Sequence, residues 1–536
     1  MRRFIYAVCL FGAIIPFQSK AQVWESDALR YSQDILGGTA RFSAMGGAFA
    51  AVGGDMSTLA YNPAGIAVYT KNQLEITPGL TLQSTNASNS TQSTTNENST
   101  LNLQSAGLVA TKKIRSKDKD AVGWKSYNFG FSYNRLNNFN DNVTIQDYSN
   151  SSTYLDYVAK QATQYGTSDQ FFANPSYYAG LLDDTIAGQY FNIIHPNLAS
   201  GNGDYIEQTE NIATTGSMGE FDIAFGGNYN NKLFIGASVG IVDVNYNLTD
   251  TYSEVAEYTD QAFGFQNYSL TQNLTTGGTG YNVKLGFIYR IFDWLRIGGS
   301  VISPTYFSMS DNYSTNWTAT YSPSPYFTSG GYVSTYPSSV NNGSPLGASE
   351  SYNYNLTTPL KAIGGAAVVI NNQGIISADY EYVDYSTINV NSSDLGGDYT
   401  SALNNAISQD FIQANNLRFG FEWVLYPVSF RAGYAIYGNP YNTSNVGYSS
   451  PRTTYSAGIG LKVNKVSFDF AYTLMQYSEQ YSFYEGAPTS TLKTNLSSAI
   501  FTLAYTFGPA KNHMPHRERF QQAYPPPPPP PPPGAY

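Results

Sequence analysis

The strongest constraint on the fold is an alternation of apolar and polar residues with a period of two. In the segment LRFGFEWVL, residues 417–425, the apolar side chains share one face of an extended chain and the polar ones share the other. The pattern returns in VSFRAGYAI, VKLGFIYRI, VSFDFAYTL and SSAIFTLAYTF. The sequence therefore predicts an all-β protein.

Membrane-spanning helices are excluded after the first 21 residues. The longest apolar stretch there, residues 233–242, is about half as long as a spanning helix requires. Only 12% of the residues are charged, compared with about 25% in an average soluble domain. The chain is therefore poor in charge and rich in strands, which fits a β-barrel that faces lipid.

The connections between strands separate a membrane barrel from a soluble sandwich, since both alternate. Tight turns are predicted at 230–231, 292–294, 371–374, 426–427 and 464–465. Long polar loops are predicted at 247–280, 304–358, 386–415, 438–452 and 476–495. With earlier strand candidates at 74–82, 105–113 and 124–135, this strict alternation predicts a transmembrane antiparallel β-barrel of about fourteen strands.

The N-terminus has the pattern of a secretory signal. Arg2 and Arg3 precede a short apolar run, and small residues stand at the cleavage positions before residue 22. Residues 1–21 are therefore predicted to be removed, together with Cys9, the only cysteine. The remaining chain then has no disulfide or cysteine metal site. Its formal charge, −10 before the loss of three basic residues, makes nucleic acid an unsuitable partner.

A Gly- and Ala-rich segment at residues 41–69 precedes the first strand and lacks a strand pattern. Asp55 is placed to cap one short turn, and Asn62 to cap a second with Pro63 at its first position. Such a composition packs closely but forms no independent core. We therefore expect a small hatch buried in the barrel lumen.

These residues resemble the N-terminal hatch of the FadL/TodX-like outer-membrane transporters of fatty acids and hydrocarbons. The resemblance rests on SAMGGAFAAVGGDMSTLAYNPAG, which ends in Asn62, Pro63, Ala64 and Gly65, and is supported by a hairpin at 359–386. It implies a hatch at 22–73 and a barrel with long extracellular loops at 74–507. It also implies a monomer without cofactor or metal in the outer-membrane lipid bilayer, which passes a small hydrophobic ligand by passive diffusion.

Two further site predictions concern the barrel wall. The family releases ligand sideways at a kink in the third strand, where Gly130 permits a break; alternatively, this glycine makes room for a bulky neighbour. Inward charges at Arg418, Glu422, Arg431 and Asp469 would guide a ligand carboxylate, although a mutually paired barrel interior is the more common arrangement.

The sequence does not predict an enzyme. The pattern GASVG at 236–240 matches a hydrolase motif but lies within a strand, without the required strand-to-helix turn. Of the three histidines, His195 lies far from the others, and His513 and His516 lie in the C-terminal tail, so they do not indicate a metal site or a catalytic triad.

The C-terminal segment, residues 508–536, ends in a proline run that favours an extended polyproline II rod. It is interpreted as a periplasmic spacer or a ligand for a periplasmic partner, or else as a dispensable end.

Two functions remain compatible with the sequence. The first is outer-membrane transport of a small hydrophobic molecule through a hatch-plugged barrel. The alternative is a non-transporting barrel that serves as a docking or shuttle component in protein secretion. A ligand-sized pocket behind residues 62–65 would favour transport.

Overall fold

The computed structural model describes residues 25–35, 37–114, 122–184, 188–194, 205–257, 265–321, 339–340, 347–371, 373–443 and 449–508. The predicted signal, residues 1–21, lies outside these ranges, as do residues 509–536 of the predicted tail and all three histidines. Within the described residues, no helix is both long and apolar enough to cross a bilayer.

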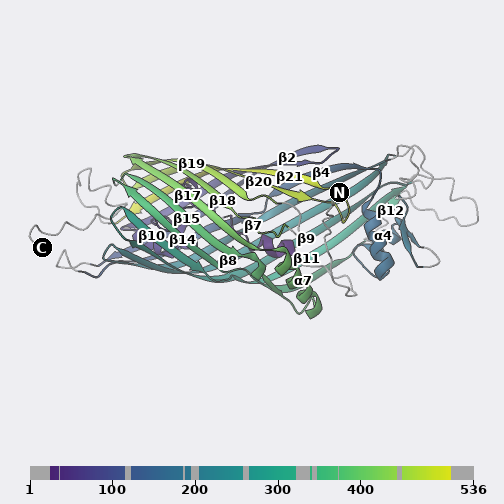
Figure 1. Cartoon of the computed structure of the whole chain (residues 1–536), viewed down its shortest axis with the longest axis horizontal. Helices are drawn as coiled ribbons and strands as arrows, with labels where there is room; N and C mark the ends of the chain where they lie inside the picture. Colours follow the sequence, from purple (N-terminus) through teal and green to yellow (C-terminus); the bar gives the residue numbers. More distant parts are fainter. Residues whose placement is uncertain are drawn as a thin grey trace, which may run out of the picture.

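The strands close into a single antiparallel ring, because the first strand pairs with the last along residues 72–88 (Figure 1). Its members are β1 (Asn72–Ser88), β2 (Ser93–Lys113), β3 (Trp124–Asn138), β7 (Tyr205–Tyr229), β8 (Leu233–Glu257), β9 (Phe265–Arg290), β10 (Leu295–Ile302), β11 (Tyr306–Tyr321), β13 (Ser349–Thr357), β14 (Lys361–Ile370), β15 (Gly374–Asp384), β17 (Gln413–Leu425), β18 (Val428–Tyr437), β19 (Arg452–Val463), β20 (Val466–Tyr481) and β21 (Ser490–Phe507).

Fourteen strand positions surround the lumen, which confirms the predicted barrel. β10 and β11 share one position because both pair with β9, at different heights. β13 and β14 share the next position, where they pair with β11 and β10. An even number of antiparallel strands allows every hairpin to connect neighbours and leaves no sheet edge.

All five predicted tight turns join consecutive strands. Asn230, Asn231, Asn371 and Asn464 adopt positive φ angles between 48° and 54° at three of them. Asparagine tolerates this left-handed conformation better than most residues, and it suits two-residue hairpins. These asparagines therefore allow the tight hairpins that connect the strands at one end of the barrel.

The two faces of each strand also follow the sequence pattern. On β17, Phe419 is 45% exposed, whereas Arg418 and Glu422 on the other face are 5% and 3% exposed. The apolar face therefore points outward, where a bilayer would cover it, and the charged face lines the lumen.

The opposite end differs from the prediction, because much of the expected loop sequence is strand. β2 begins at Ser93 rather than at residue 105. β8 continues to Glu257 and β9 begins at Phe265, so both strands extend into the predicted loop 247–280. These extensions are rich in Asn, Ser and Thr. On β8 and β9 their inner face carries buried residues such as Tyr252 and Leu270, whereas their outer face is polar and does not show the apolar pattern of a lipid-facing strand.

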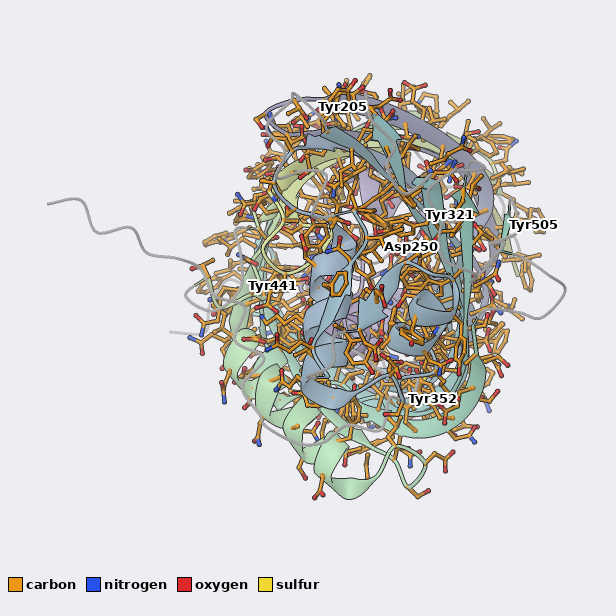
Figure 2. The ribbon with its side chains drawn as sticks, turned by 90° about the vertical axis from the view of Figure 1, so that its right-hand side faces the viewer. Tyr205, Asp250, Tyr321, Tyr352, Tyr441 and Tyr505 are labelled. Carbon is orange, nitrogen blue, oxygen red and sulfur yellow. The ribbon has the colours of Figure 1, made fainter. Side chains whose placement is uncertain are left out.

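The segment between β3 and β7 folds across this end of the barrel. It contains β4 (Asp141–Ser149), α4 (Tyr154–Tyr165), α5 (Ala173–Tyr178), β5 (Leu182–Asp184) and β6 (Tyr190–Asn192). The Trp317 indole nitrogen donates to the Phe171 carbonyl (2.9 Å) and the Tyr321 hydroxyl to the Ala179 carbonyl (2.8 Å). These helices lie over the barrel mouth in Figure 2, and we call this segment the mouth cap.

Shorter elements complete the wall near this end. They are β12 (Ser339–Val340), η3 (Tyr385–Thr387), β16 (Asn389–Asn391) and α7 (Gly397–Asp410). α7 lies beside η3 and β16 at the lower side of the barrel in Figure 1.

Candidate functional site

The N-terminal elements fill the lumen and touch walls on several sides. These elements are α1 (Glu25–Arg30), α2 (Ala40–Ala44), α3 (Thr58–Tyr61) and η1 (Pro63–Val68). α2 packs against β18–β21, whereas α3 and η1 pack against β3, β7 and β8, and η1 also against β9. All but three of residues 39–69 are buried. This segment therefore occupies the space enclosed by the barrel.

Glycines in the wall allow this close packing. A Cβ atom on Gly236 of β8 would lie 2.3 Å from the Pro63 carbonyl oxygen, and one on Gly286 of β9 would lie 2.0 Å from the Asn62 side-chain oxygen. No other residue permits such an approach without moving the backbone of η1 or the Asn62 side chain. Gly236 thus serves packing, although it opens the hydrolase-like pattern.

Asn62 links the internal segment to itself and to the wall. Its side-chain oxygen accepts a hydrogen bond from the Ala64 backbone N–H (3.1 Å), which caps η1, with Pro63 at the first position. Its amide nitrogen donates to the carbonyls of Ala50 (2.6 Å) and Phe287 (3.2 Å). One fully buried side chain therefore joins both halves of the segment to β9.

We expect Asn62→Ala to loosen this segment without unfolding the barrel. Loss of the cap costs about 1 kcal/mol, and the carbonyls of Ala50 and Phe287 lose a donor. Hydrogen exchange of residues 39–69 should accelerate, while the strands stay protected. Asn355→Ala is the matched control, because it removes the same side chain from the outward face of β13, away from the internal segment. Unchanged exchange in Asn62→Ala would contradict the assigned role of this side chain.

Asp55 organises the other half of the segment. Both of its carboxylate oxygens accept from the Thr39 hydroxyl (2.9 and 2.8 Å), and one accepts from the Ser57 backbone N–H (3.0 Å). Burial raises the pKa of Asp55 above its ordinary value of 3.8, against the lowering effects of Arg41 and these hydrogen bonds. The ionised carboxyl is thus held in place at a cost in folding free energy.

This raised pKa predicts the pH dependence of docking. A carboxyl whose pKa is higher in the folded state contributes stability that is complete below its unfolded pKa, about 3.9, and is lost as the pH rises through the raised value. Protection of residues 39–69 against hydrogen exchange, measured relative to the intrinsic exchange rate at each pH, should therefore fall with rising pH in this window. Asp55→Asn should reduce that dependence, and an identical pH profile for both proteins would contradict the prediction.

The four predicted lumen charges all lie inside, in two separate groups. Glu422 accepts two hydrogen bonds from Arg41 of the internal segment (3.0 and 2.7 Å) and one from Arg431 (2.7 Å), which also binds Asp469 (2.6 Å). Arg418 instead binds Glu381 (3.1 Å) and the Tyr61 hydroxyl (2.8 Å). These charges therefore bind one another and the internal segment, as in a paired interior.

Several charged residues that form ion pairs in the lumen were not predicted from the sequence. Lys284 binds Glu220 (2.7 Å) and Asp222 (2.8 Å) within the wall, and Lys361 of β14 pairs with Asp34 of the internal segment. Alternation correctly places Lys284 on the inner face. The partners across the lumen depend on how the ring closes, which no local pattern records.

An interruption in the wall lies between β2 and β3. Their backbone ladder ends at the pair Ser105 and Asn134, although β2 extends back to Ser93. Beyond this point the contact is through side chains, such as Asn96 with Thr144 (2.9 and 3.2 Å). We call this boundary, residues 93–104 against 135–149, the side seam.

The internal segment reaches the side seam. The backbone N–H groups of Ile35 and Gly37 donate to the carbonyls of Leu136 and Arg135, both at 2.8 Å. Leu136 lies at a register shift between β3 and β7. The edge of β3 that β2 leaves free is therefore paired with the N-terminal segment.

Gly130 lies away from this interruption, in continuous ladders with Val109 of β2 and Ala224 of β7. A Cβ atom there would lie 2.5 Å from the Ile66 side chain. Its place in the structure therefore corresponds to the packing alternative, and the structural break lies at residues 135–137.

A cavity adjoins both the side seam and the internal segment. It is small and partly open, and extends from Leu136 and Met218 to the ion pairs of Lys284, Lys361 and Arg418. Tyr31, Ala60 and Tyr61 of the internal segment form another side of it. The cavity is thus amphipathic, and Ala60 and Tyr61, which line it, directly precede residues 62–65 in the sequence.

The remaining sequence motifs carry no visible chemistry. Ser238, within the hydrolase-like pattern, lies in the middle of β8 and donates a hydrogen bond to the Leu59 carbonyl (3.0 Å). No group of three potential metal ligands occurs in the part of the chain that the structure describes.

Comparison with known proteins identifies the fold. No family model and no curated protein matches the sequence. A Pseudomonas aeruginosa FadL homologue of known structure matches with a TM-score of 0.52 at 13% identity, over 89% of this chain and 99% of that chain. The toluene transporters TodX of P. putida and TbuX of Ralstonia pickettii match at 12% and 13% identity, with TM-scores of 0.49 and 0.47. They cover 89% and 88% of this chain, and 100% and 99% of their own. The chain has the fold of the FadL-type channels.

Proposed function

We propose that this protein is an outer-membrane channel that moves small hydrophobic molecules inward by passive diffusion. The observation that carries the proposal is the amphipathic cavity in the lumen that reaches Leu136 at the side seam. The shared fold supports it, since neighbours with this fold are described as a FadL homologue and toluene transporters. In this proposal, residues 22–73 act as the hatch.

The hatch closes the direct route, so the ligand leaves sideways. The internal elements touch the walls on several sides of the lumen, where they would obstruct bulk flow along the barrel axis. The side seam is the place where the backbone ladder of the wall is interrupted. When Ile35 and Gly37 leave the edge of β3, the cavity opens beside Leu136 through the barrel wall.

The cavity lining favours a ligand with an apolar body and a polar head. Leu136, Met218 and Phe307 offer apolar surface, and the ion pairs on the other side offer hydrogen-bonding groups. Lys284 and Arg418 each hold several partners in the wall and hatch. Lys361 pairs with Asp34 of the hatch, so a ligand head would meet this pair first.

Uptake by proteoliposomes tests the proposal. We expect protein-dependent, saturable entry of a fluorescent long-chain fatty acid or of toluene. Leu136→Trp should reduce uptake at least several-fold, because the larger ring fills the cavity at the seam. Phe131→Trp is the matched control, since Phe131 lies on the same strand but faces outward, 46% exposed.

The same assay addresses the secretion alternative. Absence of saturable uptake for both probes, or equal uptake by Leu136→Trp and the control, would overturn transport through this cavity. Specific retention of secreted proteins by the reconstituted barrel would then favour the docking function.

A further inference from the structure

The outward face of five neighbouring strands changes from apolar to polar residues above the apolar band, the part of the wall that faces lipid. Register aligns its residues in rows across β7, β8, β9, β11 and β13. The rows, from the band upward, are Gly219, Asp243, Thr279, Ser308 and Asn355; Ser217, Asn245, Gly277, Ser310 and Asn353; Thr215, Asn247, Thr275, Asn312 and Ser351; Ala213, Thr249, Asn273, Ser314 and Ser349; and Asn211, Thr251, Thr271 and Asn316. We call this surface the outer polar face.

The outer polar face carries few charges and no cation. Asp243 is the only ionisable side chain in these rows, none of which contains Lys or Arg. One further carboxylate, that of Asp394, binds Asn353 on β13 (2.9 and 3.2 Å). A surface that faces only water typically carries about 25–35% charged residues, and recognition of phosphate uses Arg or Lys. The face is therefore suited to a neutral, hydrogen-bonding partner rather than to an anionic one.

Its side chains form a regular array of hydroxyl and amide groups. Thr249 donates to Asn273 (3.1 Å), Thr251 and Thr271 share a hydrogen bond (3.3 Å), and Ser351 donates to Asn312. Neighbouring strands lie about 4.8 Å apart, so donors and acceptors recur at short, even intervals. A polyhydroxylated chain can satisfy several of these groups at once.

The height of the face also limits what lies against it. From Asp243 to Thr251, strand rise and tilt give about 20 Å along the barrel axis. A headgroup layer adds only about 5–8 Å to each side of the hydrocarbon. The outer polar face is thus too tall for headgroups alone to cover.

Its lower margin continues directly into the lipid-facing surface. The row below contains Phe221, Ile241, Tyr281 and Tyr306. Tyr281 and Tyr306 pair in register and are 56% and 61% exposed. Tyrosine favours such a boundary between apolar and polar surroundings, and its ring offers a flat surface for stacking.

We propose that the outer polar face binds the neutral saccharide chains of outer-leaflet glycolipids. The partner is chosen by chemistry: an uncharged polyhydroxylated polymer fits a tall, uncharged hydroxyl and amide array next to the lipid. Saccharide contact at this side anchors the barrel among glycolipids. The proposal rests on the outer-membrane orientation of the proposed function, but it does not depend on transport.

Dextran, a neutral glucan, is the probe for this surface. We expect the purified full-length protein in detergent to be retarded on dextran beads and to elute with soluble dextran. Thr249→Val, Thr251→Val and Thr271→Val together should weaken retention at least about tenfold, since three hydroxyls are lost. Thr95→Val, Thr453→Val and Thr491→Val form the matched control, because these threonines lie outside the outer polar face, on β2, β19 and β21.

Other results would overturn the assignment. These are absence of retention, equal loss in both triple variants, or stronger binding to dextran sulfate than to dextran. Concentration-dependent dimers of the native protein in sedimentation, lost in the first variant only, would assign the face to a second copy instead. Heat-dependent migration on a detergent gel verifies that each variant is folded. The dextran experiment does not measure uptake. A negative result with dextran therefore does not contradict the proposed transport function, and a negative uptake result does not affect the interpretation of dextran binding.

Discussion

Deletion of residues 37–69 is expected to give an inserted barrel that conducts ions and has lost saturable uptake of its hydrophobic probe. The deleted segment is enclosed by strands and contributes no strand to the ring. An eight-strand barrel is filled by its own side chains, whereas 16–18 strands leave an aqueous channel. A fourteen-strand ring without its internal segment should therefore hold a continuous aqueous path. Conductance in planar bilayers and uptake by proteoliposomes measure the two effects.

The deletion needs two controls. Heat-dependent migration on a detergent gel verifies that the variant has folded, and the Arg431–Glu422–Asp469 contacts remain to support the wall after Arg41 is lost. A second variant that also lacks the mouth cap helices α4 and α5 separates closure by the hatch from closure by the cap. If the single deletion does not conduct but the double deletion does, the cap alone seals the lumen. If neither conducts, the segment is not a hatch.

The barrel could be predicted because its apolar band imposes a local rule on every strand. Phe419 and Arg418 are neighbours in the sequence but face opposite sides of the sheet. Apolar residues are favoured on the side that faces lipid, and polar residues on the side that faces the lumen. Asparagines at the turns, such as Asn230 and Asn464, mark where a hairpin reverses. Both features can be read within about ten residues of sequence.

No local sequence pattern predicts the strand extensions or the ion pairs that cross the lumen. Residues 93–104 are strand in the structure, but their Asn-, Ser- and Thr-rich sequence resembles a loop. Lumen contacts such as Arg41 with Glu422 join residues 381 positions apart. The sequence predicts that both side chains face inward, and only ring closure determines that they meet.

A disulfide between the hatch and the side seam is expected to block uptake reversibly. A Cβ atom built on Gly37 lies 3.5 Å from the Arg135 Cβ, within the range of about 3.5–4.5 Å found in disulfides. The only native cysteine, Cys9, belongs to the predicted signal, so Gly37→Cys with Arg135→Cys offers a single pair. The nearest atom to the new Cβ on residue 37 is the Gln104 side-chain oxygen at 2.4 Å, the end of a flexible side chain that can move.

If ligand leaves at the side seam, Ile35 and Gly37 must first release the carbonyls of Leu136 and Arg135. The oxidised double variant should then show uptake reduced at least about tenfold, and a reducing agent should restore it. The reduced form of the same protein is the matched control, and each single variant shows the effect of its side chain alone. Full uptake by the oxidised protein would mean that the ligand passes the hatch along the barrel axis, and that the interrupted ladder between β2 and β3 is not the exit.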